Sequence, residues 1–400
     1  LINVNAIEPS TGTDITLGAS GDTITVPSGA TITNSGTANN FTSYRLNAQP
    51  FIINGNMQVA QRGTSFSQPD TNNNAYPVDR FSFQTGSIGV YTSTQEALTS
   101  GDAFNAGFKM AARIDCTTAQ ASPAAGDYFW FEYRAEAQDC LAWKKGTTSA
   151  TVMTLSFWVK SNKTGTAQVN LRDDDNDRMV CALYTISSGD TWEKKVVTFP
   201  METSYPMNND NGTGFRFEWP LGGGSTYSSG TAPTAWEART DADVAANNLA
   251  INDSTSNDWA ITGIQAEVGT YTSATIPPFQ FESYGDNLYR CLRYYEARGQ
   301  TVNSEIVTFG QTIANNKCIC PLQFVTKRAV PSFSLGTSIG INQYNGVAGS
   351  VNATSANNAG VDSCRFDVTI DATGFAITQG MACIQIDNTD KDGLKIDAEL

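Results

Sequence analysis

The stretch TLSFWVKS (154–161) decides the fold, because it alternates apolar and polar side chains along its length. Leu155, Phe157 and Val159 fall on one side of an extended chain, and Trp158 falls on the other. A period of two is typical of a strand that buries one face. Comparable strand segments recur over 128–135, 152–161, 166–172, 178–186, 192–199, 214–221 and 258–269. Many strands with polar turns between them predict an all-β protein, with an antiparallel β-sandwich of the jelly-roll type over residues 48–283.

The composition of the 400-residue chain argues against several classes of function. The chain contains 25 Lys and Arg and 39 Asp and Glu, which gives a net charge of −14. This negative charge repels nucleic-acid phosphates. Histidine is absent, which removes His-dependent nucleophilic catalysis and His-ligated metals. No apolar run approaches the roughly 18 residues of a membrane helix. We therefore expect no nucleic-acid partner, no membrane insertion, no cofactor and no enzymatic activity.

Residues 1–47 have a different sequence pattern from the rest of the chain. Short strand signals are separated there by turn formers such as GASGD and PSG. Each signal offers only two inward apolar side chains, too few for one copy to offset an ordering entropy of about 1–2 kcal/mol per residue. Three copies wound together would complete one another's core. We therefore predict a short trimeric β stem, with a disordered leader as the alternative. The core-forming residues of this stem would be Ile15, Leu17, Ile24, Val26 and Ile32.

One helix is predicted, in YGDNLYRCLRYYEARG (284–299). Asp286 is placed to cap its first turn, apolar residues follow at spacings of three and four, and Gly299 offers a stop. We interpret it as a linking helix over 284–299. Strand signals return beyond it, so residues 300–400 are expected to form a smaller C-terminal β domain.

Eight cysteines are too few for a disulfide-stabilised scaffold of this length. Only Cys318 and Cys320 are close in sequence, and no second pair completes a zinc set. Buried free thiols are the expected structure. The eight are Cys116, Cys140, Cys181, Cys291, Cys318, Cys320, Cys364 and Cys383.

Two sets of carboxylates raise the question of metal binding or catalysis. Asp173, Asp175 and Asp177 alternate as in half of a calcium loop, but the glycine and the closing glutamate of such a loop are missing. A polar hairpin turn is expected there, with calcium binding as the weaker alternative. Glycoside hydrolysis would need two carboxylates about 5–10 Å apart across a cleft, a geometry that sequence does not reveal. The available residues are Glu132, Glu136, Asp139, Glu218 and Glu237.

Aromatic residues are better candidates for binding, since their rings stack on the C–H faces of sugars. Most of the seven Trp lie in strand patterns and are expected in the core. Trp158 lies on the polar side of its strand, whereas Trp236 ends the Gly- and Ser-rich stretch 222–236, which also holds Tyr227. Loops on a rigid β scaffold commonly carry binding. The candidate receptor- or sugar-binding residues are therefore Tyr227, Trp236 and Trp158.

The segment NGNMQVAQRGTSF (54–66), followed by YPVDRFSF (76–83), resembles a recurrent family of tail-fibre proteins of tailed bacteriophages. The resemblance continues through 154–166, 191–200 and 261–297 and ends at KIDAEL. The opening ITLGASGDTITVPSGATI is similar to fibre-stem segments of marine phages. The family implies a homotrimeric virion protein whose β-sandwich resembles carbohydrate-binding modules. The motif residues would be structural, capping turns and pairing within the sandwich: Asn54, Asn56, Gln58, Arg62, Asp79, Arg80, Gln265, Glu267 and Gly269.

We therefore expect a structural tail-fibre protein that recognises the host surface during adsorption. It would be made in the cytoplasm of a host bacterium and become part of the virion, with its N-terminal end joined to other phage tail proteins. Its receptor would be a host cell-surface glycan or protein. Two alternatives stay open: a non-receptor structural adaptor or head-attached fibre, and, less favoured, a polysaccharide-degrading tailspike.

Overall fold

The computed structural model describes residues 49–68, 73–299, 305–314, 316–335, 339–343, 348–357, 359–370, 380–386 and 393–400. These residues all belong to one unit of the chain, Tyr44–Leu400. The stem predicted over residues 1–47, with Ile15, Leu17, Ile24, Val26 and Ile32, lies outside the described residues.

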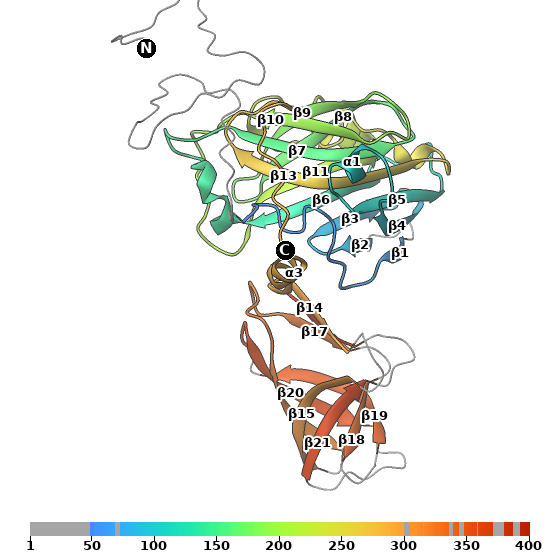
Figure 1. Ribbon diagram of the computed structural model, residues 1–400, viewed down its shortest axis with the longest axis vertical. Helices are drawn as coiled ribbons and strands as arrows, with labels where there is room; N and C mark the ends of the chain where they lie inside the picture. The colour runs from blue at the N-terminus through green and yellow to red at the C-terminus, as the bar shows by residue number, and fades with distance from the viewer. Residues whose placement is uncertain are drawn as a thin grey trace, which may run out of the picture. The chain divides into compact units, whose positions relative to one another are not determined.

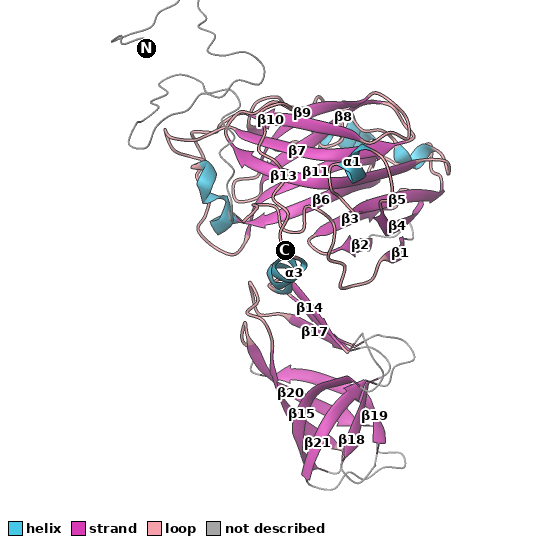
Figure 2. Cartoon of the chain, in the orientation of Figure 1, coloured by secondary structure: helices cyan, strands magenta, loops and turns pink. Residues whose placement is uncertain are grey.

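Two antiparallel sheets pack face to face as a β-sandwich (Figure 1). The six-stranded sheet has the order β1 (Ser65–Gln68), β4 (Val90–Ala97), β5 (Met110–Thr118), β13 (Asp258–Val268), β7 (Met153–Ser161) and β10 (Glu193–Phe199). The seven-stranded sheet has the order β12 (Glu237–Ala238), β9 (Arg178–Ile186), β8 (Gly165–Asp173), β11 (Thr213–Gly223), β6 (Tyr128–Glu136), β3 (Phe81–Gly86) and β2 (Asn73–Val78). Strands dominate the described chain (Figure 2), so the all-β prediction is confirmed.

The core lies between the two sheets and follows the predicted period of two. On β7, Leu155, Phe157 and Val159 are fully buried in this core. Trp219 and Trp259, from opposite sheets, are also completely buried in it. Each strand therefore presents its alternate side chains on an outer face, where any binding residues of the sandwich would lie.

Short helices occupy the connections of the sandwich. They are α1 (Asp102–Asn105), α2 (Ser225–Ser228) and the 3-10 turns Ala137–Trp143, Asp241–Asp243 and Ile251–Asp253. The linking helix α3 spans Tyr284–Leu292 and is shorter than the expected range 284–299. Ser283, not Asp286, is its N-cap, since its hydroxyl accepts from the Asp286 backbone N–H at 3.1 Å. Among the described residues, no helix combines the length and apolarity needed to cross a membrane.

The remaining strands form two further β units. A small three-stranded sheet has the order β14 (Tyr295–Arg298), β22 (Leu394–Asp397) and β17 (Ser332–Leu335). A closed barrel has the order β15 (Glu305–Ala314), β16 (Lys317–Gln323), β20 (Ser363–Ile370), β19 (Ala348–Asn357), β18 (Ile339–Gln343) and β21 (Gly380–Ile386). Helix α3 ends before Tyr295 because the next residues pair with β22, so that Tyr295 faces Asp397 across the ladder.

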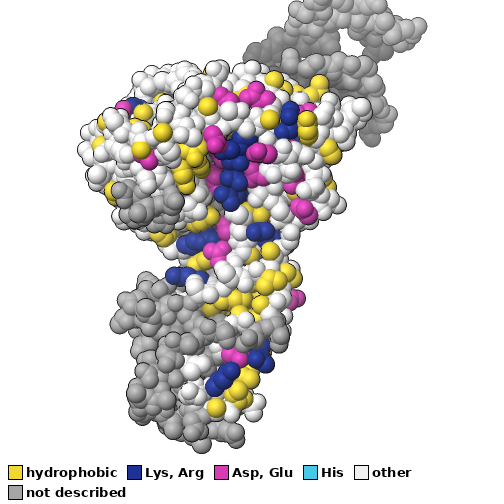
Figure 3. All heavy atoms as spheres, turned by 180° about the vertical axis from the view of Figure 1, so that it is seen from behind, with side chains coloured by type: hydrophobic (Ala, Val, Ile, Leu, Met, Phe, Trp, Pro, Cys, Tyr) yellow, Lys and Arg dark blue, Asp and Glu magenta, His cyan; other side chains and the backbone are white. Residues whose placement is uncertain are grey.

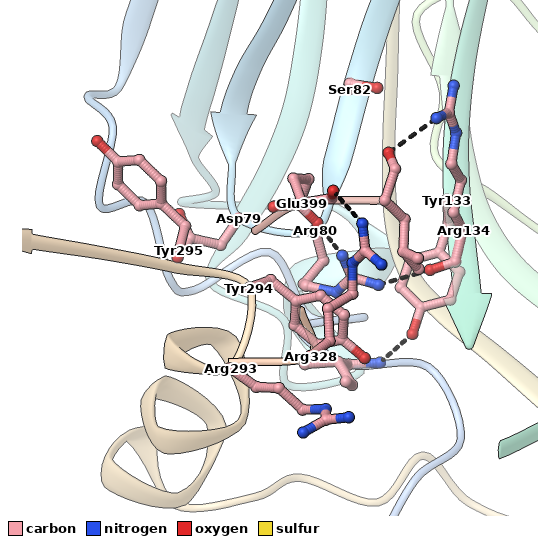
Figure 4. Close-up of polar contacts among 12 residues, drawn as sticks. Asp79, Arg80, Ser82, Tyr133, Arg134, Arg293, Tyr294, Tyr295, Arg328 and Glu399 are labelled. Atoms are coloured by element: carbon pink, nitrogen blue, oxygen red, sulfur yellow. Dashed lines mark hydrogen bonds and ion pairs between the residues drawn. The ribbon is translucent and has the colours of Figure 1, made fainter. Parts of the chain in front are cut away.

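Several residues of the family-like motif bind the C-terminal part of the chain. We call these contacts the joint: α3, the small sheet and residues 398–400 against the sandwich. The Arg80 guanidinium lies 3.3 Å from the centre of the Tyr294 ring and pairs with the Glu399 carboxylate (Figure 4). Arg62 also pairs with Glu399, at 3.1 Å, and lies over the Tyr295 ring at 3.7 Å. The two arginines thus tie the sandwich to the end of the chain, in addition to any pairing within the sandwich.

The asparagines of the same motif complete the joint. The Asn287 side-chain amide on α3 donates to the side-chain oxygens of Asn54, at 3.1 Å, and Asn56, at 3.2 Å. Asn54 has a positive φ of 60°, a conformation that asparagine tolerates better than most residues. The motif therefore fixes a turn of the sandwich and the start of α3 at the same time.

Seven of the eight cysteines have described side chains, and each of these seven is buried with a free thiol. Cys318 and Cys320 lie on the same face of β16, with their sulfurs 3.6 Å apart. Burial raises the pKa of Cys140, so its thiol stays protonated at neutral pH. For these seven residues, the structure agrees with the expectation of buried free thiols.

Candidate functional site

The outer face of the seven-stranded sheet carries the most distinctive set of side chains. On β6, the inward residues Phe129, Phe131 and Tyr133 belong to the core. The alternate residues of the same strand, Trp130 among them, therefore point to the outer face. Tyr128 also lies there, against Gly86 of β3, where a Cβ atom would come within 2.3 Å of the tyrosine ring.

Three half-buried aromatic rings form a cluster on this face. The rings of Tyr128 and Trp130 stack with centroids 4.2 Å apart and an interplanar angle of 18°. Tyr227, from α2, packs edge-on against both, at 5.8 Å and 5.7 Å. We call these residues the aromatic cluster. It offers a ring surface that is anchored by the sheet beneath it.

A polar row continues from the aromatic cluster across β6, β11 and β8. Strand pairing sets Glu132 opposite Glu218 and Arg134 opposite Arg216. Arg134 pairs with Glu132 at 2.6 Å, and Arg172 pairs with Glu218 at 2.8 Å. We call these five residues the polar row. Viewed from behind, Lys and Arg side chains form a stripe bordered by Asp and Glu side chains on the sandwich (Figure 3).

The carboxylates of the polar row lie beneath its guanidinium groups. The Glu132 and Glu218 side chains are 2% and 0% exposed, whereas that of Arg134 is 25% exposed. Burial raises the pKa of Glu132, and the charge of Glu218 adds to this rise against the effect of nearby arginines. Burial would also raise the pKa of Glu218, but the charges of Arg172 and Arg216 outweigh it and hold that pKa below its usual value.

The polar row is close to electrically neutral at its surface. Arg216 pairs with Asp174 at 2.5 Å, so three arginines are matched by Asp174 and the two glutamates. A neutral ligand rich in hydroxyl groups fits such a surface better than an anion does, because no net positive charge would attract an anion. Planar guanidinium, carboxylate and amide groups offer donors and acceptors for hydroxyl groups.

Among the carboxylates considered for hydrolysis, Glu132 and Glu218 lie opposite each other on the paired strands β6 and β11. A glycosidase needs one carboxyl to protonate the leaving oxygen and another to attack or activate water. Here both carboxylates are enclosed and ion-paired with arginines. The arrangement supports the sheet face and gives a substrate no direct access to either group.

The structure separates the three aromatic residues predicted to bind a receptor. Tyr227 belongs to the aromatic cluster. Trp236 packs on the core near Phe215, its indole N–H donating to the Pro200 carbonyl at 2.9 Å. Trp158 lies on the outer face of the other sheet, packed with Trp192. The three residues therefore do not share one site.

The acidic run proposed as the weak calcium candidate forms a turn between β8 and β9. The buried Asp173 carboxylate pairs with Lys145 at 2.6 Å and accepts from the Asp175 backbone N–H at 3.1 Å. Asp175 instead binds the Asn208 side chain at 2.8 Å, and Asp177 has a positive φ of 49°. Within the described residues, no group of three or more Cys, Asp or Glu side chains is arranged to hold a metal ion.

Sequence reasoning missed Trp130 as a surface residue. The segment YFWFEYRA (128–135) opens with four aromatic residues, and its two charged residues, Glu132 and Arg134, fall in the same register as Trp130. That register was a usable signal, because charged side chains mark the outer face of a half-buried strand. The sequence presents Glu132 only as one of several carboxylates, since its neighbours Glu218 and Arg216 come from another strand.

Comparisons with known proteins found similarity only among solved structures. No family model and no curated protein matches the chain. Among solved structures, the enzymatically active domain of tailspike protein 4 from bacteriophage CBA120 matches with 12% identity and a TM-score of 0.27, over 55% of this chain and 21% of that one. A family 11 carbohydrate-binding module from Clostridium thermocellum, in complex with a mixed-linked tetrasaccharide, matches with 10% identity and a TM-score of 0.25, over 52% and 96%. TM-scores below 0.5 are too low to carry an inference, and none is drawn from them.

Proposed function

We propose that this chain is a structural tail-fibre protein of a tailed bacteriophage, and that the outer face of its seven-stranded sheet binds carbohydrate on the host surface. The observation that carries the binding proposal is the aromatic cluster beside the polar row. Aromatic rings stack on sugar C–H faces, and planar polar groups pair with sugar hydroxyls. The fibre assignment is supported by the family resemblance of segments 54–66 and 76–83, whose motif residues build the joint.

The proposed site predicts which aromatic residues matter for glycan binding. Trp130→Ala and Tyr227→Ala should each weaken binding by about tenfold, because a lost aromatic contact is worth about 0.5–1.5 kcal/mol beyond its area. Binding would first be found on an array of bacterial glycans with the intact protein, and then measured by calorimetry.

Trp158→Ala is the matched control, since it removes the same ring from the outer face of the other sheet. Its affinity should equal that of the unmodified protein. Equal losses in all three folded variants would place the site elsewhere. A failure of the intact protein to bind any glycan would favour the structural adaptor or head-attached fibre instead.

The proposed fibre is a homotrimer that joins other tail proteins through its N-terminal end. Deleting residues 1–45 should therefore shift the protein from trimer toward monomer in analytical ultracentrifugation, because the stem residues would bury their apolar side chains only around a shared axis. A truncated protein as firmly trimeric as the full chain would show that assembly depends on another segment.

A further inference from the structure

A cavity of about 770 Å³ lies away from the polar row, at the junction of the sandwich with α3. This volume is typical of a site for a small molecule. Its walls come from residues 49–53, the turn Ala137–Trp143, the end of β13, residues 277–280, α3 with the two residues that follow it, and residues 325–326. Segments that are distant in sequence thus meet around one hollow.

Aromatic rings form part of the cavity wall. Phe51 packs edge-on against Trp143, with ring centroids 4.4 Å apart. Trp143 is nearly buried, whereas Phe51 is half-buried and keeps part of its surface open. Tyr289 on α3 is 64% exposed and lines the same cavity. A ligand in the cavity would therefore meet ring surface from two elements.

Most charged groups of the lining already have partners. Arg293 makes two bonds to the Glu136 carboxylate, at 2.6 Å and 2.7 Å. Its side chain points away from the Arg80 and Glu399 contacts (Figure 4). Arg290 donates to Glu282 and to a backbone carbonyl, each at 2.7 Å. Each of these arginines therefore already has a carboxylate partner within the protein.

Asp139 differs from the other charged residues of the lining. It is exposed, and the described residues provide it with neither an ion pair nor a hydrogen bond. Partial removal of its carboxyl from water raises its pKa and the neighbouring charge of Glu136 raises it further, whereas the charges of Arg293, Arg290 and Arg80 act in the opposite direction. A cation beside Asp139 would remove this repulsion. The cavity therefore combines a carboxylate that has no direct ion pair with aromatic walls, a combination that favours ammonium groups.

Amide and hydroxyl side chains complete the lining, from Gln49, Gln138, Gln280 and Thr326. A lysine side chain would leave them unused, because its stem is aliphatic, whereas sugar hydroxyls would pair with them. We infer that the cavity is a second binding site, which takes an amine-bearing sugar with its ammonium group at Asp139. This site is separate from the proposed carbohydrate face, and its existence does not depend on that face.

Calorimetry at about pH 6, where an amine is protonated, tests the inference with three probes. They are glucosamine, N-acetylglucosamine and Nα-acetyl-lysine methylamide. The unmodified protein should bind glucosamine about tenfold more tightly than N-acetylglucosamine, because a charge-assisted bond is lost on acetylation. It should also prefer glucosamine to the lysine probe.

Asp139→Asn should abolish the preference for glucosamine while leaving binding of N-acetylglucosamine unchanged. Asp102→Asn is the matched control, since it removes an equal charge from an exposed helix residue outside the cavity lining and should keep the preference. Tyr289→Ala should weaken both sugars together. Trp130→Ala should leave the preference intact, which separates this site from the sheet face.

Several results would overturn the inference. They are absence of glucosamine binding, equal affinity for the two sugars in the unmodified protein, a preference for the lysine probe, or an unchanged preference in folded Asp139→Asn protein. Far-ultraviolet circular dichroism of each variant confirms folding. Because Asp139 is exposed, its replacement by the isosteric asparagine is expected to leave the fold intact.

Discussion

Trp219→Ala should lower the free energy of unfolding by about 3–5 kcal/mol, the usual cost of truncating a large buried aromatic residue. Trp219 is completely buried, with ring centroids 5.6 Å from Phe157 and 5.8 Å from Phe131. These two rings come from opposite sheets, so the substitution leaves a cavity between the layers of the sandwich. Urea unfolding followed by tryptophan fluorescence and circular dichroism measures the loss.

Trp158→Ala provides the comparison for this prediction. It removes the same side chain from a half-buried position outside the main core, so its cost should be clearly smaller. Similar losses for both variants would mean that Trp219 does not hold the sheets together as described.

Glu136→Ala should weaken the joint, with a loss of about 1.5–3 kcal/mol, the usual range for hydrogen bonds to a charged group. The Glu136 carboxylate is fully buried and accepts from the Arg293 guanidinium, from the Tyr294 hydroxyl at 2.7 Å and from the Gln138 amide at 2.7 Å. Without it, the joint loses the acceptor shared by α3 and the sandwich. Limited proteolysis near α3, together with urea unfolding, would detect the loss.

The same residue predicts how the joint responds to acid. Burial alone would raise the pKa of Glu136, but hydrogen bonds from Arg293 and Tyr294, with the charge of Arg293, hold it below its usual value. A lowered pKa in the folded state stabilises the protein above the unfolded value of about 4.3, and this contribution is lost as the pH falls through the folded pKa. The unmodified protein should lose stability over that range, and Glu136→Ala should lose less.

Glu237→Ala serves as the control for both measurements, because Glu237 is an exposed glutamate on β12. It should change neither stability nor its acid dependence measurably. If Glu136→Ala behaved like Glu237→Ala, the hydrogen bonds at Glu136 would have no net effect on stability.

Much of the sandwich could be predicted from sequence. The segment 178–186 coincides with β9, and 128–135 lies within β6, because both are short runs rich in large apolar and aromatic residues. The strands β1 to β5 gave a weaker signal. For example, β4 reads VYTSTQEA and has Tyr91 as its one large, fully buried side chain, so its pairing with β5 defines it more than its own pattern does.

The helix end and the candidate site depended on long-range contacts. The helical period runs on through Tyr295, yet that residue pairs with Asp397, about a hundred positions later in the chain. In the same way, Glu132 meets Glu218, and Tyr227 meets Trp130, only when distant strands and loops come together. Local patterns identified the outward side of a strand, but they did not show which side chains of other strands lie next to it.

The position of β22 has a consequence for biosynthesis. Chains are made from the N-terminus, and N-terminal parts generally fold first. The strand β22 lies between β14 and β17, and residues beyond it neutralise Arg62 and Arg80. The strand β22 and Glu399 are therefore translated only after all strands of the sandwich. A chain that stops short of Leu394 would lack the Asp397 and Glu399 carboxylates that pair with Arg62 and Arg80, and β14 and β17 would lack the strand between them.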